Sequence, residues 1–310
     1  NRSLVFQMDP SANDQHGTTA TFPISLGPRQ QHKIRVSLLL EESKGPQPSI
    51  RQPSNLSSFK KHESDIEKHA DKWMDEITHV SGNGSALDQL MERSFRSLRV
   101  LRSHLGKDAY FAAGVPWFVT LFGRDSLITA LQMLPYHPPI AEQTLRLLAQ
   151  YQGTREDDER DEQPGKILHE LRMGELANLK VIPQTPFYGT VDATPLFLIL
   201  VARHAAWTGS LHLFRDLRPH IDLALQWLDR QRGTYLSYES HTHKQMVNKG
   251  WKDSGNALVN EDGTLAEPPI ALVEVQGYVY AAWLGMADIF ERVGEQAKAD
   301  RLKQDANQLR

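Results

Sequence analysis

The sequence predicts a mainly helical protein in which paired helices form an inner and an outer ring, preceded by the end of a β-sandwich. Hydrophobic residues recur with helical spacing from residue 63 to the end of the chain, and with a period of two in residues 1–42. Within the helical part, segments that are apolar on all sides alternate with segments that carry one apolar stripe. The first kind is buried and the second faces water on one side. An irregular helical bundle is the alternative to two rings.

Residues 1–42 have the pattern of short β-strands separated by polar turns. Three runs of alternating apolar residues predict antiparallel strands with one buried face. Because three strands make a poor independent domain, we expect them to be the C-terminal strands of an N-terminal β-sandwich that begins outside this chain. The alternating residues are Leu4, Phe6 and Met8; Phe22, Ile24 and Leu26; and Ile34, Val36, Leu38 and Leu40.

Residues 43–62 (SKGPQPSIRQPSNLSSFKKH) are rich in proline, serine and glycine, which predicts a linker. The helical domain is therefore expected to occupy residues 63–310. Residues 153–165 (GTREDDERDEQPG) form a charge run, for which a mobile solvated loop is the simplest interpretation.

About eight helices are expected in the helical domain. A closed toroid of six helix pairs would contain twelve, so we expect the ring to be incomplete, with a further part beyond Arg310. The inner helices are expected near 125–134, 192–207 and 271–292, the outer ones near 140–151, 211–231 and 295–310, and two earlier helices near 64–79 and 86–104.

The composition excludes several classes of function. The formal net charge is −3, which does not favour nucleic acid or an anionic membrane as a partner. The chain has no cysteine, and its thirteen histidines lack metal-ligand spacing, so no metal site is expected. No apolar run approaches the ~20 residues of a membrane-spanning helix. We expect a cytoplasmic protein that needs no cofactor, and neutral polymers such as glucans remain possible substrates.

Two junctions in the first half of the domain carry candidate binding residues. In WFVTLFGRDS, Asp125 begins an inner helix, where a carboxylate can cap free N–H groups. The pair Arg124 and Asp125, with Trp117 nearby, also suits the binding of sugar hydroxyls. In GKILHELRMGE, the charged residues stand among apolar ones, so a binding site and a surface salt-bridge cluster are both open. These residues are His169, Glu170 and Arg172.

Two later junctions and one helix carry further candidates. Asp192, in YGTVDAT, precedes an apolar helix, so capping is a sufficient role for it. Trp251 offers a stacking face, and Asp253 beside it is either a proton donor or an Asx-turn aspartate. Glu274 and Gln276 lie in the first turns of an apolar inner helix, where a buried glutamate is costly unless it is paired or functional.

These motifs resemble a known family. AGVPWFVTLFGRDSLITAL, PGKILHELRMGE, FYGTVDATPLF, NKGWKDSGNAL and PIALVEVQGYVYAA are similar to segments of bacterial amylo-α-1,6-glucosidases, which are like the glucosidase part of glycogen debranching enzymes. The similarity runs from about residue 110 to 290, and residues 1–42 resemble the end of the family's β-domain more weakly. It implies an (α/α)6 toroid that is distantly related to trehalases.

The resemblance also implies an inverting glycoside hydrolase for an α-glucan or a small glucoside. In trehalase-like relatives the acid is an aspartate in a Gly-Trp-Asp loop, which here reads Gly250-Trp251-Lys252-Asp253. Asp253 is therefore the expected acid and Asp125 the expected sugar ligand. No segment matches the base, which we expect beyond Arg310. The implied pocket lining is Arg124, Asp125, His169, Glu170, Arg172, Asp192, Glu274 and Gln276, with Trp117, Tyr188 and Trp251 as stacking faces.

Two other functions are compatible with the same fold. A sugar epimerase would need a pair of histidines as acid and base, of which only His169 is well placed. A non-catalytic glucan-binding protein would lack a carboxylate that faces Asp253 across the pocket.

Overall fold

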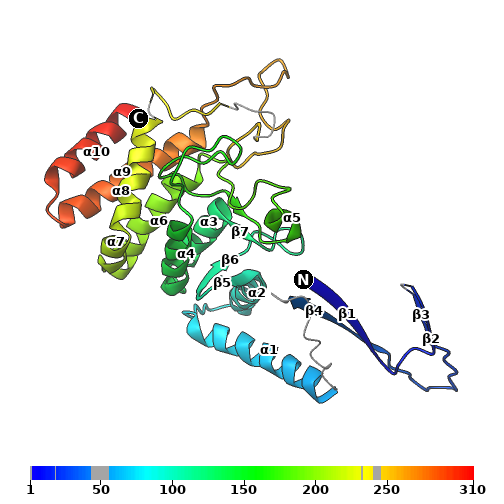
Figure 1. The fold of residues 1–310 in the computed structure, drawn as a ribbon. Coiled ribbons are helices and arrows are strands. Elements are labelled where there is room, and N and C mark those ends of the chain that lie inside the picture. Colours follow the sequence, from blue (N-terminus) through cyan, green and yellow to red (C-terminus); the bar gives the residue numbers. More distant parts are fainter. Residues whose placement is uncertain (1, 18, 43–55, 232, 240–245) are drawn as a thin grey trace. The chain divides into compact units, whose positions relative to one another are not determined.

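The computed structural model describes residues 2–17, 19–42, 56–231, 233–239 and 246–310. This part of the chain is mainly helical, as predicted, with ten helices and four two-stranded sheets (Figure 1). The chain divides into two compact units, Asn1–His69 and Ala70–Arg310. In the described ranges, no helix combines the length and the apolar character that crossing a bilayer requires.

The first unit contains two antiparallel ladders. Strand β1 (Arg2–Asp9) pairs with β4 (Arg35–Glu42), and β2 (Asp14–His16) pairs with β3 (Thr19–Thr21). The predicted strand at Phe22–Leu26 is wrong, since these residues follow β3 without strand structure. The predicted buried face is also wrong for three side chains that are about half exposed, because a two-stranded ladder has no second layer of its own. They are Phe6, Val36 and Leu38.

Helix α1 (Leu56–Glu76) begins within the predicted linker, so residues 56–62 are helical, while residues 43–55 lie outside the described part. The division between the compact units falls inside this helix. The end of α1 contributes Trp73 to a small core with α2 (Ser85–Leu101) and the hairpin of β5 (Arg102–Leu105) and β6 (Asp108–Phe111). Neither β5 nor β6 was predicted, because in the sequence alone the helical pattern of α2 continues to residue 104.

The helices after residue 122 form two layers. In the first layer α6 packs between α3 and α9, and these are the three helices predicted as inner ones. Twelve of the sixteen residues of α6 are buried, in agreement with its uniformly apolar sequence. It ends at Gly209, whose φ of 70° is the left-handed conformation that commonly terminates a helix. The bounds are Gly123–Met133 for α3, Ala193–Thr208 for α6 and Val273–Arg292 for α9.

Helix α9 departs from the prediction because it is not buried on all sides. Val273, Gly277 and Asp288 are exposed, and a groove between α6 and α9 is lined by Ala202 and Leu284, among others. The two helices approach closely there, since a Cβ atom added to Gly285 would lie 2.7 Å from Cβ of Ala202.

The second layer consists of the helices predicted as outer ones. Helix α4 packs on α3 and α6, α8 packs on α6, and α10 packs on α9. The predicted helix at 211–231 is interrupted at Leu217, which separates α7 from α8. The bounds are Pro138–Gln150 for α4, His212–Asp216 for α7, Arg218–Arg230 for α8 and Gln296–Leu309 for α10.

Ion pairs join neighbouring helices of this layer at their partly exposed faces. Arg218 of α8 binds Glu295, the residue that precedes α10, through two bonds of 2.5 and 2.7 Å. Arg146 of α4 contacts Asp216 of α7 at 2.6 Å. Two-bonded arginine–carboxylate pairs have a defined geometry, so the contact of Arg218 with Glu295 constrains how α8 and α10 align.

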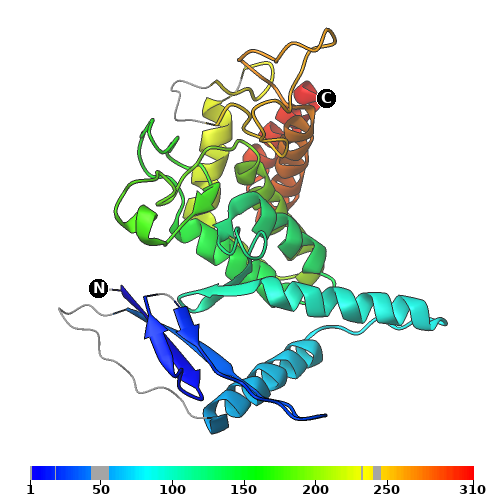
Figure 2. The ribbon, with the colours of Figure 1, turned by 90° about the vertical axis from the view of Figure 1, so that its right-hand side faces the viewer.

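The long connections 151–192 and 231–272 lie at the end of the layers where α6 and α9 begin (Figures 1 and 2). The first contains β8 (Glu170–Leu171), which pairs with β7 (Leu121–Phe122), and the short helix α5 (Glu175–Asn178). The solvated loop predicted at 153–165 is only partly correct. Its first residues are exposed, but Asp161 and Glu162 are buried because their carboxylates are paired with cations.

Gly165 is the last residue of this loop, and a substitution at this position tests how closely the loop packs. Its φ is +88°, and a Cβ atom there would lie 2.2 Å from the carbonyl oxygen of Leu223. We expect Gly165→Ala to lower the free energy of unfolding by at least about 2 kcal/mol, through backbone strain and the clash. Gly84→Ala is the matched control, because a Cβ atom there meets no atom within 4 Å. Equal melting temperatures for the two variants in differential scanning calorimetry would contradict this account.

Candidate functional site

The candidate site is built around the guanidinium of Arg124, in the first turn of α3. One nitrogen, Nη1, donates to Oδ2 of Asp192 and to the carbonyl oxygen of Gly250, both at 2.9 Å. The other, Nη2, donates to Oδ2 of Asp253 at 3.4 Å. Arg124 and Asp192 are 5% and 1% exposed. One buried cation therefore joins the starts of α3 and α6 to the loop that leads to α9.

Asp192 occupies the position before α6, but its carboxylate does not cap that helix. It pairs with Arg124 instead, so capping is not its role. Burial raises the pKa of Asp192, while Arg124 and Thr190 oppose this change. Burial also lowers the pKa of Arg124, but the carboxylates of Asp192, Asp125 and Asp253 more than offset it and leave the pKa raised. The guanidinium therefore stays charged.

The other acidic candidates lie close to this group. Asp125, partly buried, follows Arg124 on α3 and makes no capping hydrogen bond. Glu274 lies in the first turn of α9, and its Oε1 atom would be 3.4 Å from a Cβ atom added to Gly250. That Cβ atom would also lie 2.2 Å from Cδ1 of Leu272, so a larger residue at position 250 would require the side chain of Leu272 to move. Gly250 thus lies next to both groups: its carbonyl oxygen binds Arg124, and a side chain at this position would approach the carboxylate of Glu274.

Tyr278 belongs to this group but was not predicted. Burial raises its pKa, and the charges of Asp192 and Glu274 raise it further, whereas Arg124 lowers it. It follows Glu274 by four residues and so lies on the same face of α9. The spacing of four residues from Glu274 is the sequence feature that could have identified Tyr278 as part of the site.

His169 lies deep in the site and is neutral. Burial, together with the nearby charges of Arg124 and Lys166, lowers its pKa to about 3. Its ring makes edge contacts with Phe122 and Phe187, with centroids 5.3 and 6.2 Å apart. Its Nδ1 atom has no hydrogen-bond partner among the described residues.

Glu170 and Arg172 form an ion pair at the edge of the site, between Nε of Arg172 and Oε1 of Glu170. Glu170 is buried, so the pair is not the surface cluster that was the alternative interpretation. Burial raises the pKa of Glu170, although Arg172 opposes this. Arg172 also donates from Nη1 to the carbonyl oxygen of Trp117 at 3.5 Å, which connects the pair to an aromatic loop.

The three aromatic candidates are placed differently. Trp117 and Trp251 are 78% and 72% exposed, so their indole faces are open to a ligand. Tyr188 is buried, its hydroxyl donates to the carbonyl oxygen of Tyr151 at 2.7 Å, and Arg160 covers its ring. The prediction of Tyr188 as a stacking face is therefore wrong, because its ring and hydroxyl are both used inside the protein.

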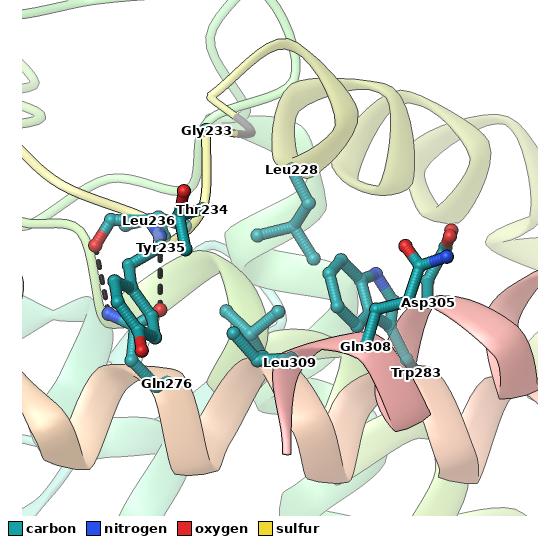
Figure 3. Close-up of a pocket in the computed structure, with 11 residues that line it drawn as sticks. Leu228, Gly233, Thr234, Tyr235, Leu236, Gln276, Trp283, Asp305, Gln308 and Leu309 are labelled. Carbon is teal, nitrogen blue, oxygen red and sulfur yellow. Dashed lines mark hydrogen bonds between the residues drawn. The ribbon is translucent and has the colours of Figure 1, made fainter.

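Gln276 is also placed elsewhere. Its amide donates to the carbonyl oxygens of Leu236 and Leu272 at 2.8 and 3.0 Å and accepts from the amide of Leu236 at 3.0 Å (Figure 3). It borders a separate cavity of about 200 Å³ near Trp283 and Leu309. The prediction that Gln276 lines the sugar pocket is wrong, because its side chain holds residues 235–237 to α9.

A second buried ionic cluster lies next to the site, and it was also not predicted from the sequence. Asp161, with φ of +53°, accepts from Nζ of Lys249 at 2.8 Å and lies 3.4 Å from Nζ of Lys166. Burial lowers the pKa of Lys166 to about 8, although Asp161 opposes this. The carbonyl of Lys249 accepts from the amide of Val191 at 2.9 Å. The segments that carry Asp192 and Asp253 are thus joined next to Arg124.

The neutral state of His169 makes stability depend on pH. In the unfolded chain its pKa is about 6.5, so below this value the unfolded state binds a proton that the folded state excludes. Stability is therefore complete above about pH 6.5 and is lost as the pH falls toward 3. Between pH 7 and 5 we expect His169 to account for a loss of about 2 kcal/mol.

Urea denaturation at pH 7 and pH 5 tests this expectation with His169→Gln, which cannot titrate. The variant should lose less stability between the two pH values than the unmodified protein, whatever its stability at pH 7. His104→Gln serves as the control because His104 is exposed. An unchanged pH dependence in His169→Gln would contradict the neutral, buried assignment.

The chain was compared with known protein families and with curated proteins, and neither comparison gave a match. Among the described residues, no group of three or more histidine, aspartate or glutamate side chains is arranged to hold a metal ion.

Proposed function

We propose that the protein is a glycoside hydrolase that cleaves an α-glucosidic bond with inversion, on an (α/α)6 toroid of which these two helix layers are a part. The observation that carries the proposal is the Arg124 group, which gathers Asp192 and Asp253, with Asp125 and Glu274 nearby, at the start of the three first-layer helices. Several fixed carboxylates and an arginine at the end of a helix layer suit a ligand rich in hydroxyl groups.

Asp253 is the proposed general acid. Its side chain is 42% exposed, so a glycosidic oxygen can reach it, whereas Asp192 is almost fully covered. Its contact with Arg124 is a single long one, and Arg124 is bound more closely by Asp192. Arg124 is therefore held mainly by Asp192, and the carboxyl group of Asp253 stays accessible to a glycosidic oxygen.

The remaining residues would bind the sugar. Asp125 would hold hydroxyl groups beside Arg124, and the exposed indole of Trp251, two residues before Asp253, would stack on a sugar ring. Arg172 and Glu170 would close the pocket on the side of Trp117. An inverting enzyme also needs a base whose carboxylate stands about 6.5–9.5 Å from the acid. We assign no residue to that role.

His169 argues against the epimerase alternative. An acid–base pair of histidines has to exchange protons near neutral pH, but burial and neighbouring cations lower the pKa of His169 to about 3. Its ring is also enclosed by Phe122 and Phe187. A structural role for His169 under the sugar pocket fits these properties better than proton transfer does.

Replacing Asp253 by asparagine tests the proposed acid. Asparagine keeps the size of the side chain but donates no proton to the leaving oxygen, so kcat for a natural disaccharide should fall about 10²–10⁴-fold. A 4-nitrophenyl α-glucoside should be affected much less, because nitrophenolate leaves without protonation. Steady-state kinetics of the full-length enzyme with both substrates provides the measurement.

Asp125→Asn is the matched control. Its proposed role is to hold sugar hydroxyls, so turnover and affinity should fall to a similar extent for both substrates. Equal slowing of both substrates in Asp253→Asn would exclude Asp253 as the acid. Selective loss of the disaccharide in Asp125→Asn would exchange the two assignments. Binding of oligosaccharides without turnover in the unmodified protein would favour the glucan-binding alternative.

A further inference from the structure

Two loops next to the candidate site form an exposed apolar surface, here called the apolar ridge. One loop contains residues 115–119 and the other residues 173–181. Each of the large apolar side chains in the ridge is half exposed or more, and a cluster of this kind on a protein surface commonly marks a binding site. They are Val115, Trp117, Phe118, Val119, Met173, Leu176, Leu179 and Val181.

Three residues of the ridge line a hollow of about 430 Å³, which is large enough for a small organic group. Its wall is mainly aliphatic, with Val119, Met173, Leu176 and Ile182 among the lining residues.

The polar lining groups are mostly engaged within the protein. The hydroxyl of Thr120 donates to the carbonyl oxygen of Leu171, and Arg172 binds Glu170 and Trp117. Apart from the exposed carboxylate of Glu175, the wall therefore offers few free hydrogen-bond partners to a sugar ring, whereas an alkyl or aryl group needs none.

The hollow borders the candidate site, since Arg172 lines the hollow and pairs with Glu170. Thr120 lies in its wall and precedes Arg124 by four residues, so their Cα atoms are at most about 14 Å apart. Strand β7, between them, pairs with β8, which carries Glu170. Arg172 then links Glu170 to the ridge at Trp117. A group attached to a sugar bound at Arg124 can therefore reach the hollow.

We infer that the leaving-group side of the site accepts an apolar aglycone, so that the preferred substrates are α-glucosides of alkyl or aryl alcohols rather than longer glucans. This inference rests on the proposed hydrolase function and narrows its substrate class. The ridge supplies the apolar contact area, and the Arg124 group binds the sugar.

The test is the hydrolysis of methyl, butyl, hexyl and octyl α-glucosides. Each methylene that enters the hollow should raise kcat/KM, by up to about fourfold if it is fully buried. In the double variant Val119→Ser/Leu176→Ser the rise should fall below about twofold per methylene. Both residues are exposed, so the fold should be retained. The matched control, Val80→Ser/Leu90→Ser, removes two equally exposed residues from loop 77–84 and α2.

A binding measurement separates failure of this inference from failure of the hydrolase proposal. Calorimetry with octyl 1-thio-α-glucoside, which resists hydrolysis, should show at least tenfold weaker binding in Val119→Ser/Leu176→Ser than in the control. Hydrolysis of every α-glucoside at equal kcat/KM would overturn the apolar aglycone alone, as would a rise along maltooligosaccharides but not along the alkyl series. Chain-length-dependent binding with no hydrolysis of any glucoside would overturn the hydrolase proposal and keep the apolar subsite.

Discussion

The buried ion pair between Arg124 and Asp192 is the constraint on which the arrangement of the site depends. Removing one partner of such a pair leaves an uncompensated charge and costs about 3–5 kcal/mol, so the two residues fix each other. Because Arg124 also binds the carbonyl of Gly250, a single side chain sets the distance between three segments that are far apart in the sequence. The apolar packing of α6 between α3 and α9 supplies the frame, and the ion pair sets its alignment at one end.

The charged groups around this pair divide into two sets with different properties. On the open side, Asp125 and Asp253 are partly exposed, so their carboxyl groups are accessible from solvent. On the closed side, Asp161 and its two lysines are buried and fully occupied with one another. The carboxylates of the first set are accessible to a ligand. The ion pairs of the second set hold neighbouring segments of the backbone together.

The sequence predicted the helices well because their hydrophobic periodicity is local, and it indicated the order of the layers because α6 is apolar on all sides. It also placed Arg124, Asp192 and Asp253 in one group, since each stands at or just before a helix start or in a loop leading to one. It could not place Tyr188 or Gln276, whose partners Tyr151 and Leu236 lie about forty residues away. Long-range partners of this kind leave no periodic signal.

Lys249 and Gly250 are each bound by a buried charged residue from another segment of the chain. The side chain of Lys249 is bound by Asp161, and the carbonyl of Gly250 is bound by Arg124. Because the carbonyl of Lys249 also accepts from the amide of Val191, the backbone at the start of the loop with Trp251 and Asp253 is held at three points. Asp161 is shared with Lys166, whose pKa is about 8. Loss of the Lys166 proton in mild alkali therefore removes one of the two cationic partners of Asp161 and leaves its contact with Lys249.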